Sequence, residues 1–410
     1  MKRYLIIGNG ATAANAIEGI RSRDKEGPIT VISKEEHPVY CRPLISYYLE
    51  GKTDLKRIGY RDEDFYMRNG VSVLYGRTAV KIDSVKRKVT TDDGKILSYD
   101  SLLIAAGSSP FVPTIKGLDT VSRKYGFMTL DDALGLEKAI TGNTRVLIIG
   151  AGLIGLKCAE GLYGRAKSIT VCDLAGRVLS SILDDECASL VKRHLEEKGI
   201  SFLLNDSVLS FENDRAFMKS GKTRDFDVLV LAVGVRPNIS LIKDIGGDTG
   251  RGITVSSRME TSIKHIYAAG DCAEAYDISS GERKVMAVLP SASIGGYTAG
   301  VNMAGGNARF DTALPINSIG FFGYHIMTAG SYEGELYEER TLDGIKRLFI
   351  KDGVLKGFML LGMSERAGIL TSLIREKTPL KEIDFDLMKK GATTAALTGD
   401  MRKDRFGKAV

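Results

Sequence analysis

The sequence lacks most of what metal-binding, disulfide-bonded and membrane-spanning proteins contain. Its five cysteines lie at positions 41, 158, 172, 187 and 272, so no two of them form a Cys-x-x-Cys or Cys-x-x-x-x-Cys pair. This spacing excludes a redox dithiol motif and favours free thiols in a reducing cytoplasm. The four histidines share no zinc-ligand spacing with these cysteines, and we expect no metal site.

Long apolar runs and strong charge excess are also missing. No run approaches the ~20 apolar residues of a membrane-spanning helix. Met1–Arg3 leads directly into the apolar stretch Tyr4–Ile7, so we expect no signal peptide. The net charge of +6, from 57 basic and 51 acidic residues, is too small to indicate a nucleic-acid-binding protein.

Proline is scarce and glycine is abundant, with 9 and 46 residues respectively. This balance favours many tight strand-to-helix turns over disorder. Two of these turns lie in a repeated unit: residues 3–14 read RYLIIGNGATAA, and residues 145–156 read RVLIIGAGLIGL. A second pair follows in the same order, SYDSLLIAAGSSP at 98–110 and DFDVLVLAVGVRP at 225–237. The repeats predict an α/β protein with two parallel sheets and two related nucleotide-binding units.

The first repeat has the residues that a dinucleotide site needs. Gly8 permits a tight turn, Gly10 lets the backbone approach a pyrophosphate, and Ala13 keeps the helix close to the strand. The helix N-terminus then favours the anionic phosphates. Glu35 follows the predicted strand Ile29–Ile32, where it can accept hydrogen bonds from an adenine-side ribose.

The second repeat carries a complete fingerprint of Gly150, Gly152 and Gly155. Asp173 ends the next predicted strand, at the place of the ribose-binding acid. A carboxylate accepts from a free 2′-hydroxyl and repels a 2′-phosphate, so we favour NADH over NADPH. Arg177 leaves NADPH open, because a nearby arginine can pair with phosphate.

Several further stretches resemble the FAD-dependent pyridine nucleotide–disulfide oxidoreductases, and most of all NADH:rubredoxin reductases and the flavin module of NAD(P)H nitrite reductases. The resemblance covers nearly all of residues 1–375. It depends on HPVYCRPLIS at 37–46, TSIKHIYAAGDCAE at 261–274, ASIGGYTAGVN at 292–302, NSIGFFG at 317–323 and ERAGILTSLIREK at 365–377.

The resemblance implies a glutathione-reductase-type fold, in which two Rossmann-like dinucleotide-binding domains are followed by a small C-terminal α+β domain. The FAD-binding domain would be discontinuous, comprising residues 1–112 and 236–315. Residues 113–235 would bind NAD(P)H, and residues 316–410 would form the C-terminal domain.

The resemblance also assigns contacts to the cofactors. Arg42 and Pro43 would lie along the FAD pyrophosphate, Asp271 would bind the ribitol, and Gly270 would permit close approach. The family usually has Gln where this chain has Gly295. The remaining implied cofactor contacts are Val80, Ala106, Gly107, Gly234 and Gly296.

Three residues are candidates for catalytic roles. Ferredoxin-reductase-like relatives pair a Lys and a Glu at the positions of Tyr47 and Lys157. We hypothesise that Lys157 lies near flavin N5 or N1 and stabilises the anionic reduced flavin. The alternative is a lysine that reaches solvent or pairs with Glu160. Cys41 is either a small packing residue or a redox-active thiol, whose pKa the adjacent Arg42 could lower.

The resemblance leaves three functions open. The first is hydride transfer from NADH to flavin N5 and electron exchange with a one-electron protein partner, such as rubredoxin, ferredoxin or an iron–sulfur subunit. The second is an NADH-dependent CoA-disulfide or polysulfide reductase, or an NADH oxidase, that uses Cys41. The third is an FAD- and NADH-binding redox sensor that acts on a partner protein. The sequence leaves monomer and homodimer equally open.

Overall fold

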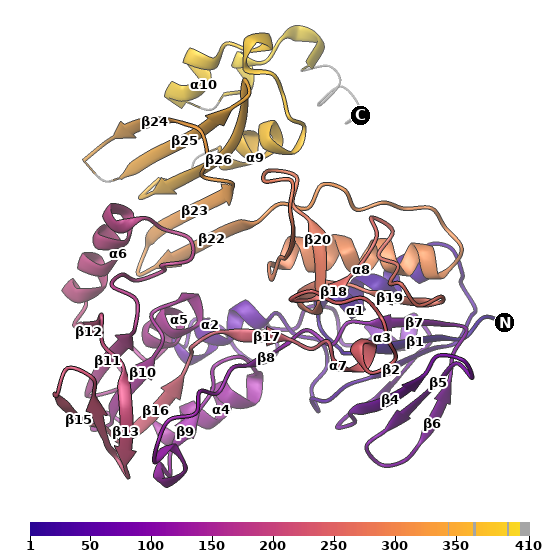
Figure 1. Cartoon of the computed structure of the whole chain (residues 1–410), viewed down its shortest axis with the longest axis horizontal. Coiled ribbons are helices and arrows are strands. Elements are labelled where there is room, and N and C mark those ends of the chain that lie inside the picture. Colours follow the sequence, from indigo (N-terminus) through magenta and orange to yellow (C-terminus); the bar gives the residue numbers. More distant parts are fainter. Residues whose placement is uncertain (343, 364–365, 392, 402–410) are drawn as a thin grey trace. The chain divides into compact units, whose positions relative to one another are not determined.

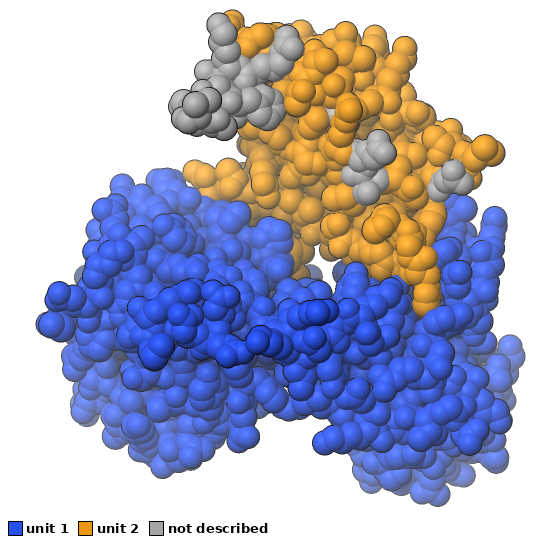
Figure 2. Space-filling model, turned by 180° about the vertical axis from the view of Figure 1, so that it is seen from behind, with its two compact units in different colours: residues 1–275, 289–310 blue, residues 276–288, 311–410 orange. Residues whose placement is uncertain are grey.

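The computed structural model describes residues 1–342, 344–363, 366–391 and 393–401. The chain forms two compact units (Figure 2). Unit 1 comprises Met1–Ala275 and Leu289–Phe310; unit 2 comprises Tyr276–Val288 and the described residues from Asp311 onward. Glu365, which opens one of the family-like stretches, lies outside the described residues.

The first repeat forms a five-stranded parallel sheet in the order β19-β7-β1-β2-β3 (Figure 1). Its strands are short and strongly apolar because helices cover both faces of such a sheet. All four residues of β1 and all four of β7 are buried. The strands and their two large helices are β1 (Tyr4–Ile7), β2 (Ile29–Ile32), β3 (Val71–Leu74), β7 (Ser101–Ile104), β19 (Ile266–Ala268), α1 (Ala11–Arg21) and α8 (Leu289–Met303).

Helices α1 and α8 pack against each other at unusually short range, because both present glycines at the contact. A Cβ on Gly296 would lie 2.2 Å from the Thr12 carbonyl oxygen, and one on Gly300 would lie 2.1 Å from that of Ala16. From α1, a Cβ on Gly19 would lie 2.3 Å from the Tyr297 carbonyl oxygen. The glycines of the family-like stretch 292–302 therefore serve helix packing.

The second repeat forms another five-stranded parallel sheet, in the order β12-β11-β10-β16-β9. Helix α4 begins with a capping box, in which the Thr129 side chain accepts from the Asp132 amide and Asp132 accepts from the Thr129 amide. The elements are β9 (Lys124–Tyr125), β10 (Arg145–Ile149), β11 (Ser168–Asp173), β12 (Ile200–Leu204), β16 (Val228–Leu231), α4 (Leu130–Ala139), α5 (Leu153–Gly161) and α6 (Asp185–Glu197).

Short strands and helices complete unit 1. The two segments that end the second sequence repeat pair with each other as β8 and β17, with Pro110 opposite Val235. Two three-stranded meanders follow the order β4-β5-β6 and β13-β14-β15. The bounds are β4 (Ala79–Asp83), β5 (Lys88–Thr91), β6 (Ile96–Ser98), β8 (Ser108–Pro110), β13 (Val208–Glu212), β14 (Arg215–Met218), β15 (Thr223–Asp225), β17 (Val235–Pro237), β18 (Ile253–Thr254), β20 (Ala273–Tyr276), α2 (Ile45–Leu49), α3 (Phe65–Arg68), α7 (Ser240–Lys243), η1 (Arg42–Leu44), η2 (Leu118–Thr120) and η3 (Gly270–Cys272).

Unit 2 is built on a five-stranded antiparallel sheet in the order β22-β23-β26-β25-β24. Helix α9 packs its apolar side onto this sheet, and Leu348, Phe358, Leu370 and Leu373 meet in the core. The elements are β21 (Arg283–Val285), β22 (Ile316–Phe321), β23 (Tyr324–Gly330), β24 (Glu335–Arg340), β25 (Ile345–Lys351), β26 (Val354–Leu361), α9 (Ala367–Arg375), α10 (Phe385–Gly391), η4 (Leu380–Glu382) and η5 (Thr394–Ala396).

The predicted fold class is confirmed: the chain is α/β, with two parallel Rossmann-like sheets and a small mixed C-terminal part. Both parallel sheets fall within unit 1, and the boundaries predicted between the two halves remain a prediction. No helix in the described ranges is long and apolar enough to cross a membrane.

Candidate functional site

The two glycines of the first turn, Gly8 and Gly10, have different roles. Gly8 has a φ of +106°, and a Cβ there would lie 2.1 Å from the Ala105 carbonyl oxygen, so the fold itself requires glycine. Gly10 is the N-cap of α1, and a Cβ there would have no described atom within 4 Å. Ala13 is fully buried. The turn therefore leaves open space in front of the N-terminus of α1, where a phosphate would be stabilised.

The neighbouring strand ends border the same space. Gly107 has a φ of +62° and a Cβ there would meet open space, whereas a Cβ on Gly270 would lie 2.3 Å from the Thr12 hydroxyl. Burial raises the pKa of Asp271, and the positive charge of Arg42 opposes this rise. The buried Ser108 hydroxyl has no hydrogen-bond partner among the described residues. Two glycines that face open space, a partly buried acid and a hydroxyl without a described partner fit a large polar ligand such as FAD.

Asn238 makes hydrogen bonds to Ala106 and Gly107 just after the end of β7, and the sequence reasoning missed it. Its side-chain amide donates to the Ala106 carbonyl at 2.8 Å, and its backbone amide donates to the Gly107 carbonyl at 3.0 Å. The Ser109 hydroxyl donates to its side-chain oxygen at 2.8 Å. The only sequence signal was its position directly after Pro237, which ends the repeated segment 225–237.

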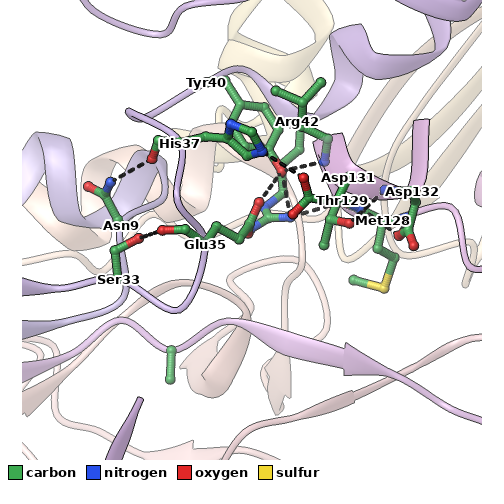
Figure 3. Close-up of polar contacts among 12 residues, drawn as sticks. Asn9, Ser33, Glu35, His37, Tyr40, Arg42, Met128, Thr129, Asp131 and Asp132 are labelled. Atoms are coloured by element: carbon green, nitrogen blue, oxygen red, sulfur yellow. Dashed lines mark hydrogen bonds and ion pairs between the residues drawn. The ribbon is translucent and has the colours of Figure 1, made fainter. Parts of the chain in front are cut away.

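Glu35 and Arg42 meet in one polar network (Figure 3). The Arg42 guanidinium pairs with Glu35 and donates to the Met128 carbonyl at 2.8 Å. The Tyr40 hydroxyl donates to the other Glu35 oxygen at 2.6 Å. Pro43 lies in the turn η1 beside Arg42. The structure thus brings two predicted FAD contacts together and adds Tyr40, which the sequence reasoning missed.

In the second fingerprint, too, some glycines pack against the backbone and others face open space. Cβ atoms on Gly150 and Gly155 would lie 2.2 Å and 1.9 Å from the carbonyl oxygens of Ala232 and Gly150. Gly152, the N-cap of α5, and Gly234, with a φ of +104°, have no described atom within 4 Å of the place that a Cβ would take. A second open space therefore lies in front of a second helix N-terminus.

Asp173 and Arg177 have different surroundings. Asp173 accepts from the Ala151 amide at 2.6 Å and from the Ala175 amide at 2.7 Å, which ties it to the fingerprint turn. Arg177 donates to Asp185 at 2.8 Å and to the Leu183 carbonyl at 3.1 Å. The acid therefore lies at the predicted nucleotide site, while the arginine is engaged at the beginning of α6.

Lys157 and Tyr47, which replace the Lys–Glu pair of the relatives, lie close together. The Lys157 ammonium lies 4.7 Å from the centre of the Tyr47 ring and also pairs with Glu160, whose side chain is only 4% exposed. The Lys52 ammonium lies 5.9 Å from the same ring. The expected alternative for Lys157, a pair with Glu160, is present, and its contact with flavin remains a prediction.

Cys41 precedes the turn η1, and its carbonyl accepts from the Leu44 amide at 2.9 Å. Burial raises the pKa of its thiol, which is partly exposed. Arg42, which could have lowered this pKa, pairs with Glu35 and donates to the Met128 carbonyl, and a redox role for Cys41 remains a prediction. Cys158, Cys172, Cys187 and Cys272 are buried, and neither they nor Cys41 form a disulfide bond.

Two predicted cofactor contacts have other surroundings. Val80 lies on β4 with 53% of its surface exposed, and Gly296 faces Thr12 in the contact between α1 and α8. Their roles toward a cofactor remain predictions. Within the described part of the chain, no three His, Cys, Asp or Glu side chains cluster as a metal site would require.

Two glycine turns at the carboxyl ends of two parallel sheets define a protein that binds two dinucleotides. Residues 2–296 match the family model described as pyridine nucleotide-disulphide oxidoreductase, and the chain belongs to this family. It is accordingly an oxidoreductase that uses FAD and a pyridine nucleotide.

Curated relatives of similar and of greater length match most of the chain. The epsilon subunit of NADH-dependent phenylglyoxylate dehydrogenase from Aromatoleum evansii is 33% identical over 92% of both chains. An NADH oxidase from Methanocaldococcus jannaschii is 32% identical over 93% of both. The assimilatory nitrate reductase electron transfer subunit of Bacillus subtilis is 31% identical over 95% of this chain, which spans about half (50%) of that relative.

Solved structures agree on the fold. Putidaredoxin reductase in its covalent complex with putidaredoxin has a TM-score of 0.88 at 20% identity, and the match covers 100% of this chain and 99% of that one. NADH:rubredoxin oxidoreductase from Clostridium acetobutylicum has a TM-score of 0.74 at 25% identity, covering 92% and 95% respectively.

Proposed function

We propose that this chain moves electrons between NADH and a one-electron protein partner, such as rubredoxin, ferredoxin or an iron–sulfur subunit. FAD supplies the chemistry, because a flavin accepts two electrons as hydride and releases them singly. The chain supplies the site, in which residues 1–112 with 236–315 would hold FAD and residues 113–235 would hold NADH.

The observation that carries this proposal is the state of the thiols. Disulfide and sulfur reductases need a reactive thiolate, which requires a lowered pKa and access. Here burial raises the pKa of Cys41, and the other four cysteines are buried. A thiol whose pKa is raised is poorly suited to that role, which supports direct electron transfer from the flavin to a redox protein.

The relatives support a protein partner. One is named as a subunit of an NADH-dependent dehydrogenase, and another as an electron transfer subunit of a nitrate reductase. The similar structure from Clostridium acetobutylicum is named for rubredoxin. An electron transfer subunit passes electrons to another chain, which is the role proposed here.

The residues of the two open turns would bind and orient the cofactors. The N-termini of α1 and α5 would hold the pyrophosphates of FAD and NADH beside Gly10 and Gly152. Glu35 would accept from the adenosine ribose of FAD. Asp271 would face the ribitol; burial raises the pKa of its carboxyl, and the positive charge of Arg42 opposes this rise.

The surroundings of Asp173 support NADH as the nucleotide. Its carboxylate lies at the fingerprint turn, where it would accept from a 2′-hydroxyl and repel a 2′-phosphate. Arg177, the residue that could pair with a 2′-phosphate, is engaged by Asp185 instead.

An NADH oxidase is the second candidate, because a relative of that name matches this chain over 93% of its length. The partial exposure of Cys41 leaves a route for a thiol to participate. The five cysteines, none of which forms a disulfide bond, also support our inference of a reducing cytoplasmic location.

Stopped-flow reduction by NADH, followed by mixing with rubredoxin or ferredoxin, tests the proposal on wild type and on Cys41→Ser. We expect fast reoxidation of the flavin by the protein acceptor and no change in the variant. Reoxidation only by oxygen or disulfides, lost in Cys41→Ser, would support the second candidate. Slow turnover with every acceptor would favour a redox-sensing role.

A further inference from the structure

Tyr40 connects the proposed FAD site to the other half of unit 1. The residue is 8% exposed. Its hydroxyl donates to Glu35 at 2.6 Å and accepts from the Leu130 backbone amide at 2.9 Å. Leu130 is the first residue of α4, which belongs with the second parallel sheet. The Tyr40 hydroxyl therefore contacts the Glu35 carboxylate in one half, as Figure 3 shows, and a helix N-terminal amide in the other half.

Arg42 strengthens the same connection. It pairs with the second Glu35 oxygen, donates to the Tyr40 hydroxyl at 3.1 Å, and donates to the Met128 carbonyl at 2.8 Å. Both oxygens of Glu35 are thus held by groups that also contact the segment around the start of α4. A carboxylate held in this way has little freedom to change its rotamer.

We infer that Tyr40 is a positioning residue, which fixes Glu35 for the adenosine ribose of FAD and couples FAD binding to the N-terminus of α4. The inference rests on the proposed FAD site at Glu35. Tyr40 does not itself need to touch the cofactor, since it acts on Glu35 from the protein side.

The coupling between FAD binding and the Leu130 amide can be measured by hydrogen exchange. A ligand that holds Glu35 also holds the Tyr40 hydroxyl, and the hydroxyl holds the Leu130 amide. By reciprocity, any group that fixes this amide must also favour FAD binding. FAD should therefore slow hydrogen exchange at Leu130, which lies in the half assigned to NADH.

A double-mutant cycle tests the inference. Tyr40→Phe keeps the buried ring and removes only the hydroxyl, and Glu35→Gln removes the carboxylate. The measurement is FAD release on dilution of the holoprotein, followed by flavin fluorescence. We expect Tyr40→Phe to weaken FAD binding about tenfold in the wild-type background, as for one hydrogen bond to a charged group. In the Glu35→Gln background it should have almost no effect.

Tyr48→Phe is the matched control. The Tyr48 hydroxyl donates to Glu137 of α4 at 2.5 Å, so it also joins α2 to α4 but does not touch Glu35. Its effect on FAD release should be the same with and without Glu35→Gln. Hydrogen exchange at Leu130 gives a second readout: FAD should protect this amide in wild type and fail to protect it in Tyr40→Phe.

The outcomes separate the two proposals. Equal effects of Tyr40→Phe in both backgrounds would overturn the positioning role and leave the FAD site at Glu35 standing. Unchanged FAD release in Glu35→Gln would overturn the FAD assignment of Glu35 and the inference with it. Electron transfer from NADH to a protein acceptor is measured on wild type and stands or falls independently of this cycle.

Discussion

At the scale of single residues, the charges around Tyr47 decide between two roles for Lys157. The ammonium lies over the Tyr47 ring and pairs with the buried Glu160. We predict that Lys157→Met lowers the free energy of unfolding by about 1–3 kcal/mol, because it removes one ion-pair partner of the buried Glu160 carboxylate. Chemical denaturation measures this loss.

The double variant Lys157→Met/Glu160→Gln separates stability from electrostatics. It should recover part of the lost stability, because the buried carboxylate is removed together with its partner. If Lys157 stabilises the reduced flavin, the flavin reduction potential of the double variant stays below that of wild type. Each tenfold change in the two-electron equilibrium corresponds to about 30 mV. A wild-type potential in both variants would leave Lys157 a purely structural role.

Asp173 is the residue that should decide nucleotide preference. Asp173→Asn keeps an oxygen for the Ala151 amide and removes the charge that repels a 2′-phosphate. We predict that the affinity for NADPH relative to NADH rises about tenfold. Adding Asp185→Asn, which releases Arg177 from its ion pair, should raise it further. Equal weakening of both nucleotides would show that Asp173 only supports the turn.

At the scale of elements, the strand–turn–helix unit separates glycines needed for folding from glycines needed for ligands. Gly8→Ala would place a Cβ 2.1 Å from a backbone oxygen, at a φ of +106°. Gly10→Ala would meet no described atom, at an ordinary φ of −97°. We predict that Gly8→Ala destabilises the apoprotein by more than about 2 kcal/mol, from strain and overpacking.

Gly10→Ala should leave the stability of the apoprotein nearly unchanged and weaken FAD binding at least tenfold, since its Cβ fills the space in front of α1. Thermal unfolding of the apoprotein and FAD titration distinguish the two variants. Normal FAD affinity in Gly10→Ala would show that the pyrophosphate lies elsewhere.

The elements were predicted from sequence because their signals are local. Apolar runs followed by glycine turns or an acidic residue predicted Tyr4–Ile7 and Ile29–Ile32, which are the bounds of β1 and β2. The contacts of Tyr40 and Asn238 could not be read in this way. Each joins segments about 90 or more residues apart through side chains, so it depends on how the halves fold together.

At the scale of the whole molecule, both copies of the repeated unit contain the same ion pair, made by the arginine just before β1 in one copy and at the start of β10 in the other. The Arg3 guanidinium contacts both oxygens of Asp100 at 3.0 Å. The Arg145 guanidinium contacts those of Asp227 at 3.1 and 2.9 Å. In each pair the arginine amide also donates to the carboxylate, at 2.8 and 2.7 Å. Asp100 and Asp227 lie in the repeated segments 98–110 and 225–237, and the arginines lie in the repeated segments 3–14 and 145–156. The two repeated motifs therefore contact each other in both halves.

This repeated pair predicts a shared loss of stability in acid. Hydrogen bonds from Arg3 and Arg145 lower the pKa of Asp100 and of Asp227 to about 2. Because the folded pKa lies below the unfolded value of about 3.9, each pair contributes its full stabilisation above about pH 4. That contribution is lost as the pH falls from about 4 to about 2.

We predict that Asp227→Asn and Asp100→Asn each lower the free energy of unfolding by about 1 kcal/mol at pH 7, a value reduced for solvent screening of partly exposed pairs. Urea unfolding between pH 7 and pH 3 should show each difference shrinking below pH 4. Asp225→Asn, at the exposed pair with Arg215, is the control and should have a smaller effect, because exposed pairs contribute little. A difference between wild type and variants that persists unchanged at pH 3 would mean that shape, rather than charge, makes these aspartates necessary in both halves.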